Sequence, residues 1–162
     1  MKKNKSDETR NILRHWQEAV PNDRLAHLVR DAGRAYTRAL QLRLADHGVP
    51  FGHWTFLRIL WESDGLTQRE LSDRAGVMEP TTFTAMKNME ALGYIERRQL
   101  PDNKKNMYVH LTPTGRALKK KLGPLAEQTN EISIQGLRAA DIQTTRRVLL
   151  TILHNLAQDE TL

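Results

Sequence analysis

Every helix boundary in residues 66–93 carries a recognisable signal, and this segment constrains the fold more than any other. The residues from Thr67 to Glu70 (TQRE) have the pattern of a capping box, in which the threonine and the glutamate satisfy backbone N–H groups at the start of a helix. Gly76 is suited to end that short helix, and Pro80 is suited to the first turn of the next. Helices joined by so short a turn approach closely, which favours a small residue between them. The segment therefore predicts two short helices with a tight turn at Gly76.

A β-hairpin is predicted directly after this helix pair. Residues 94–100 and 106–112 have the composition of strands and surround the polar tip 101–105. The first strand and the tip carry a cluster of basic side chains, namely Arg97, Arg98, Lys104 and Lys105. The order of short helix, glycine turn, second helix and two-stranded ribbon predicts a winged helix-turn-helix, in which the ribbon is the wing and the second helix enters the major groove of DNA.

Long amphipathic helices are predicted on both sides of this motif. Apolar side chains recur every three or four residues over 25–46, and a further helix is predicted over 50–62. After the hairpin, a helical region begins at Pro113, and Gly123-Pro124 is expected to kink or break it. A last helix is predicted from about Ala139. The expected fold class is therefore mainly α with a small β-hairpin wing, a winged helix-turn-helix flanked by long dimerisation helices.

The N-terminal segment has less pattern. Residues 1–10 are charged and polar, and we expect a disordered tail. Residues 11–20 are compatible with a short helix that Pro21 stops. Asn22 or Asp23 is suited to cap the next helix, because its side-chain oxygen accepts an orphan backbone N–H.

Composition excludes several classes of protein. The 162-residue chain has a formal net charge of +6 and a pI of about 9.8, which is compatible with a polyanionic partner. It has no cysteine, so disulfides and thiolate metal sites are excluded. No apolar run approaches the roughly 18 residues of a membrane-spanning helix. The first residues do not resemble a secretory signal, so we expect a cytoplasmic protein.

Motifs for catalysis are missing from the sequence. The histidines show no zinc-ligand spacing, and neither HExxH nor a phosphate-binding P-loop occurs. No serine has the context of a nucleophile elbow. We therefore expect no enzyme activity and no cofactor or metal.

The second helix of the pair has a polar face opposite its core stripe. Its predicted core residues are Thr82, Ala85, Met86, Met89 and Leu92. Helical geometry then turns Thr81, Thr84, Lys87 and Asn88 outward. These side chains can hydrogen-bond base edges, and a threonine methyl can contact a thymine methyl. Most polar helix faces are merely solvated, but the adjoining basic hairpin favours contact with nucleic acid here.

Residues 66–115 resemble the MarR family of bacterial regulators. The segment LTQRELSDRAGV resembles the first helix of the family's motif, and TTFTAMKNMEALGYIERR resembles its recognition helix and first wing strand. The segment DNKKNMYVHLTPTG resembles the wing. With the long flanking helices, which form the dimerisation region in the family, the resemblance covers about residues 22–158. Where the family usually has Asp-x-Arg in the wing, this chain has Asn103-Lys104-Lys105, so Asn103 cannot form the ion pair that the resemblance implies, whereas Asp102 is placed to do so.

The resemblance implies a homodimer that binds a pseudo-palindromic operator in double-stranded DNA, as a repressor. Base contacts are expected from the second helix, and phosphate contacts from the start of the first helix and from the wing. The DNA-binding residues predicted in this way are Gln68, Arg69, Pro80, Thr81, Thr84, Lys87, Asn88, Arg97, Arg98, Lys104 and Lys105. A helical dimeric interaction protein without DNA binding is the alternative function, although it leaves the glycine turn and the basic hairpin unexplained.

Aromatic side chains gather on the helices next to the motif. They are compatible with a pocket for an effector, although for each of them a place in the core is the simpler interpretation. Family members often bind small phenolic or carboxylate ligands, so the resemblance implies release from DNA by a small aromatic acid. Arg34 and His53 are the candidate polar partners of its carboxylate. The candidate ligand-binding set is Arg34, Tyr36, Phe51, His53 and Trp54.

The expected organisation follows from these elements. Residues 1–20 are the tail and short helix, residues 21–48 and 113–160 form the helical dimerisation region, and residues 49–112 form the DNA-binding lobe.

Overall fold

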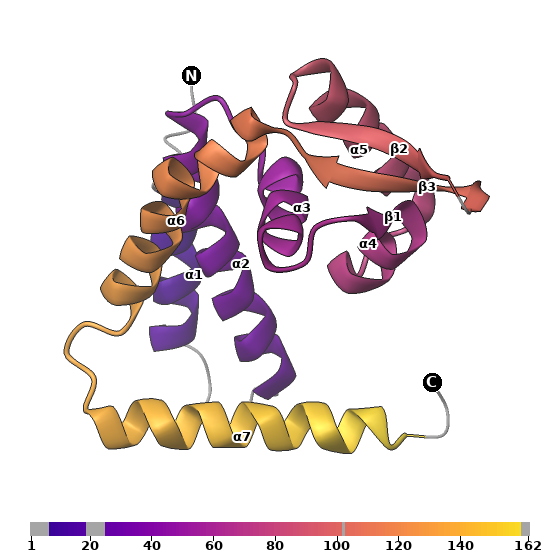
Figure 1. Ribbon diagram of the computed structural model, residues 1–162. Helices are drawn as coiled ribbons and strands as arrows, with labels where there is room; N and C mark the ends of the chain where they lie inside the picture. Colours follow the sequence, from indigo (N-terminus) through magenta and orange to yellow (C-terminus); the bar gives the residue numbers. More distant parts are fainter. Residues whose placement is uncertain (1–6, 19–24, 102, 160–162) are drawn as a thin grey trace.

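The computed structural model describes residues 7–18, 25–101 and 103–159 (Figure 1). Helices dominate it, with one small antiparallel sheet. The elements are α1 (Asp7–Glu18), α2 (Leu25–Ala45), α3 (Phe51–Glu62), β1 (Leu66–Thr67), α4 (Gln68–Ala75), α5 (Glu79–Ala91), β2 (Ile95–Leu100), β3 (Asn103–Leu111), α6 (Pro113–Ser133) and α7 (Ala139–Ala157). The mainly helical fold class with a β-hairpin wing, predicted above, is confirmed.

The chain forms two groups of elements joined through α3 (Figure 1). Helices α1, α2 and α6 lie together on one side, where α2 packs along α6. Helices α4 and α5 and the sheet form a lobe on the other side, and the β2–β3 hairpin projects from it. Helix α3 packs against α2, α4 and α6, so it connects the lobe to the long helices.

The core is continuous from the C-terminal half of α2 through α3 to the lobe. Leu44, Leu57, Leu71 and Met86 are fully buried, and Leu122 of α6 closes the core from the other side. Burying side chains of this size stabilises the folded state by about 1.5–3 kcal/mol each. The lobe is therefore fixed to α2 and α6 by one hydrophobic core.

The sheet has a third strand that sequence reasoning missed. The strand order is β1-β3-β2, and the two-residue strand β1 pairs with β3 through Leu66 and Val109. Strands β2 and β3 form the predicted hairpin, in which Arg98 lies opposite Tyr108. β3 begins at Asn103, so the hairpin tip is shorter than predicted. Backbone pairing between β2 and β3 continues as far as Leu100 opposite Asn103, after an irregularity in register between Gln99 and Leu100. Lys104 and Lys105 therefore belong to a strand rather than to the tip.

Three further expectations need correction. Residues 7–10, expected in the tail, are helical, and the negative charge of Glu8 in the first turn interacts favourably with the positive end of the helix dipole. Of the kink or break predicted at Gly123-Pro124, the break does not occur, because α6 continues to Ser133; Pro124 is exposed, so water can satisfy the carbonyl that loses its partner. Leu92 is 51% exposed rather than in the core, because α5 ends at Ala91 and Ile95 takes the buried position instead.

Some expectations fall outside the described residues. They are the caps at Asn22 and Asp23, the disordered state of residues 1–6 and the bracing role of Asp102. Within the described residues, no helix is both long and apolar enough to cross a membrane.

Helix α7 stands apart from the rest of the described chain. It lies across the ends of the other long helices, and none of its residues is buried (Figure 1). Its apolar side chains Val148, Leu149, Leu150, Leu153 and Leu156 are exposed. Helix α7 therefore does not bury its apolar stripe against the described part of its own chain.

Candidate nucleic-acid interface

Helix α4 begins at the capping box that the sequence predicts. The backbone N–H of Thr67 donates to Glu70 Oε2 at 2.8 Å, and the backbone N–H of Glu70 donates to Thr67 Oγ1 at 3.3 Å. The hydrogen bond from the Thr67 backbone lowers the pKa of the Glu70 carboxyl from its ordinary value. Gly76 ends the helix with a φ of 64°, a left-handed conformation that glycine adopts without steric cost. Both ends of α4 are thus fixed as predicted.

A buried hydrogen bond joins the two helices of the motif. Ser72 Oγ of α4 donates to Thr82 Oγ1 of α5 at 2.7 Å, and both residues are buried. Ser72 Oγ also lies 3.0 Å from the carbonyl oxygen of Gln68. A buried hydroxyl without a partner is costly, so this pair resists any separation of the helices. Sequence reasoning placed Thr82 in the core but missed Ser72, whose only signal was a polar residue on an otherwise apolar side of a short helix.

The predicted outward face of α5 is exposed. Pro80, Thr81, Thr84, Lys87 and Asn88 all lie on the surface, whereas Thr82, Met86 and Met89 are buried. The Thr84 hydroxyl donates to the carbonyl of Pro80 at 3.1 Å, so its proton is used within the helix while its oxygen can still accept. The helix thus presents donors, acceptors and one positive charge to solvent, which are the groups that base edges and phosphates bind.

The first turn of α4, which precedes α5 in the chain, carries two further predicted DNA-binding residues. Gln68 is half-buried and Arg69 is exposed there. Backbone N–H groups at the start of a helix favour a nearby anion. Contact of these two residues with phosphate remains a prediction.

The wing is joined to α5 by an ion pair. Arg97 of β2 donates from Nε and Nη2 to Glu90 Oε2 of α5, at 3.0 and 2.5 Å. Hydrogen bonding to Arg97 lowers the pKa of Glu90, and the same bond raises the pKa of Arg97. Arg98 is paired with Glu96 on the same strand. In the free protein the two arginines of the wing thus have carboxylate partners, and their contact with DNA remains a prediction.

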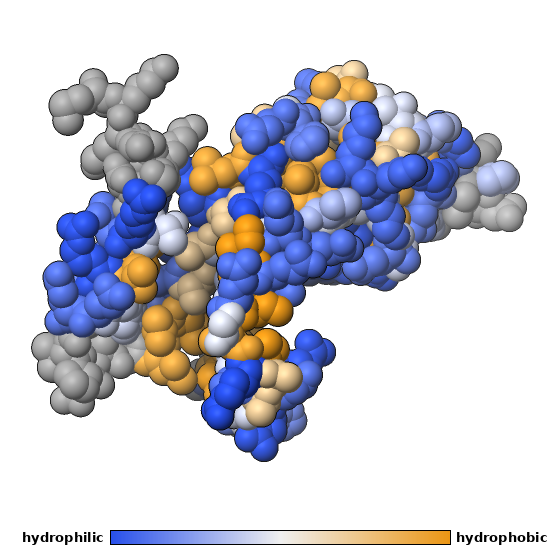
Figure 2. Space-filling view, turned by 90° about the vertical axis from the view of Figure 1, so that its left-hand side faces the viewer, coloured by the Kyte–Doolittle hydropathy of each residue, from blue (hydrophilic) through white to orange (hydrophobic). Residues whose placement is uncertain are grey.

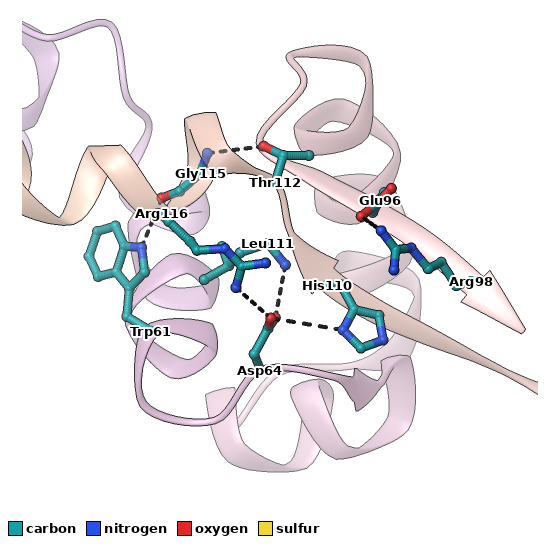
Figure 3. A network of polar contacts seen from close by, with 9 residues as sticks. All are labelled: Trp61, Asp64, Glu96, Arg98, His110, Leu111, Thr112, Gly115 and Arg116. Atoms are coloured by element: carbon teal, nitrogen blue, oxygen red, sulfur yellow. Dashed lines mark hydrogen bonds and ion pairs between the residues drawn. The ribbon is translucent and has the colours of Figure 1, made fainter. Parts of the chain in front are cut away.

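Asp64 connects the turn before β1 to the strand and helix that follow the wing (Figure 3). Its Oδ1 accepts from the backbone N–H of Leu111 at 2.8 Å, and its Oδ2 pairs with Arg116 at 2.9 Å. The His110 ring lies 3.8 Å from Oδ2. Desolvation alone would raise the pKa of Asp64, but the bonds from Leu111 and Arg116 outweigh it and hold the pKa below its ordinary value.

Two more contacts fix the start of α6 against the lobe. Thr112 caps the helix by accepting from the backbone N–H of Gly115 at 3.1 Å, and its hydroxyl donates to the carbonyl of Gly93 at 2.6 Å. The Trp61 indole N–H donates to the carbonyl of Gly115 at 2.9 Å (Figure 3). The end of the wing and the beginning of α6 are thus held by the side chains of Thr112 and of Trp61 in α3.

At the wing tip, the backbone of Lys104 and Lys105 lies in β3. The hairpin carries them away from the body of the lobe (Figure 1). A projecting basic ribbon is suited to phosphate contact beside a helix in the major groove.

The candidate ligand residues are not gathered in one place. Arg34 pairs with Glu8 of α1 at 3.4 Å, and Tyr36 donates to Ser133 Oγ of α6 at 2.6 Å. Trp54 is buried and meets Trp61 edge to face. His53 is buried, desolvation lowers its pKa, and its Nδ1 has no hydrogen-bond partner among the described residues.

Phe51, the remaining member of that set, lines a groove of about 370 Å³ between the end of α2 and the start of α3. The groove is also lined by Leu42, Val49 and Arg38. The Nε atom of Arg38 is buried and has no hydrogen-bond partner within the described residues. Sequence reasoning missed Arg38, which looked like one of several arginines along an exposed helix face.

These elements define a winged helix-turn-helix, the architecture of a DNA-binding regulator. The family model described as "MarR family" matches residues 52–107, the span from α3 to the wing. Over this span the chain is similar to the MarR family, whose members are transcriptional regulators.

Curated and solved relatives show a similar sequence and a similar fold. The chain is 30% identical over 101 residues to the HTH-type transcriptional regulator TtmR of Methylorubrum extorquens, a match that covers 62% of this chain and about half, 52%, of TtmR. The fold is similar to that of a MarR family regulator from Listeria monocytogenes complexed with 26mer DNA, with 24% identity, a TM-score of 0.75, and coverage of 85% and 91% of the two chains. It is also similar to that of a MarR family protein of Mycobacterium tuberculosis in complex with salicylic acid, with 23% identity, a TM-score of 0.66, and coverage of 82% and 98% of the two chains.

Proposed function

We propose that this regulator acts as a homodimeric repressor that binds a pseudo-palindromic operator through α5 and the wing. The observation that carries the proposal is the exposed polar face of α5, held at a fixed angle to α4 by the buried Ser72–Thr82 hydrogen bond. The Listeria neighbour was crystallised with DNA, which supports the same use of this fold. A cytoplasmic location is part of the proposal, since the operator lies inside the cell.

The apolar surface of the long helices supports the dimer. Helix α7 has no buried residue, and Leu25, Leu28, Ile132 and Leu137 of the neighbouring segments are also exposed. Figure 2 shows hydrophobic side chains on the face where these helices stand above α7. A second copy would bury this surface, and a two-fold dimer places two α5 helices against successive major grooves, about 34 Å apart. We therefore keep residues 21–48 and 113–160 as the dimerisation region and residues 49–112 as the DNA-binding lobe.

The contacts divide by role in this proposal. Thr81, Thr84 and Asn88 contact base edges, because an asparagine offers adenine both a donor and an acceptor. Phosphates are contacted by the basic and polar side chains around this face, namely Gln68, Arg69, Lys87, Arg98, Lys104 and Lys105.

The proposal is tested by selecting bound sequences from random double-stranded DNA. A palindromic consensus is expected, with affinity that falls steeply as salt rises. Asn88→Ala should relax the preference at one base pair per half-site, at a cost of about 1–3 kcal/mol. Asn130→Ala, at an exposed position of α6 outside the DNA-binding lobe, is the control and should leave the base preference unchanged. A dimer that selects no sequence and binds no DNA would instead favour the alternative of a helical interaction protein.

An aromatic carboxylic acid is the proposed effector. The groove at Phe51 has the size of a small-ligand site, and Arg38 offers a buried donor to a carboxylate. The Mycobacterium neighbour in complex with salicylic acid supports this class of ligand. Arg34, Tyr36, His53 and Trp54 remain candidate contacts that a conformational change would have to bring to the ligand.

Salicylate titrated into the free protein and into the operator complex tests the effector. Reciprocity requires that operator DNA weaken salicylate binding by the factor by which salicylate weakens DNA binding, typically 5- to 150-fold. Arg38→Gln should weaken salicylate binding, and Arg58→Gln, on the exposed side of α3, is the matched control. Equal affinities in the two titrations would exclude allosteric release by this ligand.

A further inference from the structure

Phe83 is an exposed aromatic side chain on the helix proposed to enter the major groove. It is 51% exposed, and it forms no aromatic pair within the described residues. Val77 and Met78, just before α5, are 37% and 77% exposed. Three exposed apolar side chains thus lie at the N-terminal end of α5, which is the end that contacts bases in a helix-turn-helix.

The position of Phe83 on α5 follows from its buried neighbours. Thr82, Met86 and Met89 form the buried stripe, and each residue of a helix is turned by about 100° from the last. Phe83 therefore lies beside that stripe, on the same flank as Lys87 and Glu90. Because Glu90 pairs with Arg97, this flank is the one that faces the wing. Phe83 lies at the wing side of the exposed polar face.

An exposed phenylalanine on this helix suggests that a binding partner covers the side chain. The exposed side chains adjacent to Phe83 on the surface of α5 are Glu79, Pro80, Thr84 and Lys87. Polar and charged groups thus interrupt the apolar surface, which is not extended as in a protein-docking patch. The major groove offers one apolar group that fits, the C5-methyl of thymine, and apolar side chains are known to contact it.

We propose that Phe83 contacts a thymine methyl in each operator half-site and so sets a preference for thymine over cytosine at that position. The proposal rests on the proposed DNA binding by α5. It adds an apolar contact to an interface whose other members are polar or charged.

Operators in which single thymines are replaced by deoxyuridine test this contact, because the replacement removes only the methyl group. Removing the contacted methyl from one half-site should weaken binding by the wild-type protein about fourfold. Removing it from both half-sites should weaken binding about fifteenfold. Phe83→Ala should bind the unmodified operator more weakly and show no further loss at that thymine. Phe83→Leu should keep part of the sensitivity to the methyl.

Leu92→Ala is the matched control, since Leu92 is also 51% exposed but lies past the opposite end of α5. It should keep the full response to deoxyuridine. A Phe83→Ala protein that responds to every deoxyuridine as the wild type does would overturn the proposal, as would a wild-type protein indifferent to every thymine methyl. If the wild-type protein still selects an operator in these experiments, only the role of Phe83 is rejected. If it selects no operator at all, the proposed function itself is rejected.

Discussion

Arg97 of β2 donates two hydrogen bonds to a single carboxylate oxygen of Glu90 in α5. This ion pair joins the wing to the helix that we propose to contact bases. The Arg97 side chain is 26% exposed and that of Glu90 37% exposed, so the pair is partly shielded from solvent. A wing fixed to α5 in this way would approach DNA together with it, so we expect the pair to affect DNA binding even without touching DNA.

Loss of this ion pair should weaken DNA binding through the geometry of the wing. We expect Glu90→Gln and Arg97→Gln to reduce operator affinity to a similar extent, and the double variant to be little weaker than either, because both remove one interaction. Binding isotherms of the three variants on one operator measure this coupling.

The salt dependence of the same variants separates a positioning role from phosphate contact. An arginine on a phosphate contributes about one unit to the slope of log affinity against log salt. If Arg97→Gln flattened the slope by that amount and Glu90→Gln left it unchanged, Arg97 would be a phosphate contact, as first expected. If both variants instead kept the slope of the wild-type protein, the result would support a positioning role for Arg97.

Asp64 should stabilise the fold at neutral pH but not in acid. Its folded-state pKa lies below its ordinary value, so its contribution is complete above the unfolded-state pKa of about 4 and is lost as the pH falls through the folded-state pKa. We expect Asp64→Asn to lower the free energy of unfolding by about 1 kcal/mol at pH 7, given the 30% exposure of the side chain. Denaturant unfolding at pH 7 and at pH 3 checks this, since the difference between the proteins should shrink at the lower pH. A constant difference would mean that the charge of Asp64 is not responsible.

Gly115 is required by the close approach of α6 to the lobe. A Cβ atom at this position would lie 2.0 Å from the backbone oxygen of Tyr94. Gly115→Ala should therefore destabilise the protein by about 1–3 kcal/mol, because the backbone must shift to relieve the overlap. Gly33→Ala in α2 is the control, since an added Cβ there meets nothing within 4 Å, and it should be neutral or stabilising. Thermal unfolding of both variants compares them, and equal stabilities would show that the contact at Tyr94 relaxes freely.

Disruption of the apolar face of α7 should dissociate the proposed dimer. Leu153 is 63% exposed, and a charge there would be buried without a partner in a dimer that covers this face. We expect Leu153→Lys to halve the mass measured by light scattering and to lower operator affinity. Thr151→Lys, on the opposite side of α7, should leave the dimer intact. A wild-type monomer at micromolar concentration would refute the dimer.

Local signals explain why much of the motif was predictable. The capping box at Thr67 and the end of α4 at Gly76 depend on residues a few positions apart, so the sequence contains all of their determinants. The outward face of α5 follows from helical periodicity alone. These features were predicted from short stretches and are confirmed.

Long-range pairing was not predictable in the same way. Strand β1 has only two residues and exists because Leu66 meets Val109, more than forty positions later. The bonds of Asp64 to Leu111 and Arg116 likewise depend on the folded topology. Candidate ligand residues were chosen by type and by neighbourhood in sequence, and the structure instead places Arg34 against Glu8 and leaves Arg38 at the groove.

The position of α7 has a consequence for duplicated genes. The helix lies outside the lobe that carries α5 and the wing, and no buried contact of its own chain constrains its apolar stripe. In the proposed dimer, substitutions in that stripe would therefore change which chains associate without changing which operator is bound. We expect two diverged copies of such a gene to stop forming mixed dimers through changes in α7 while both still recognise their ancestral operator.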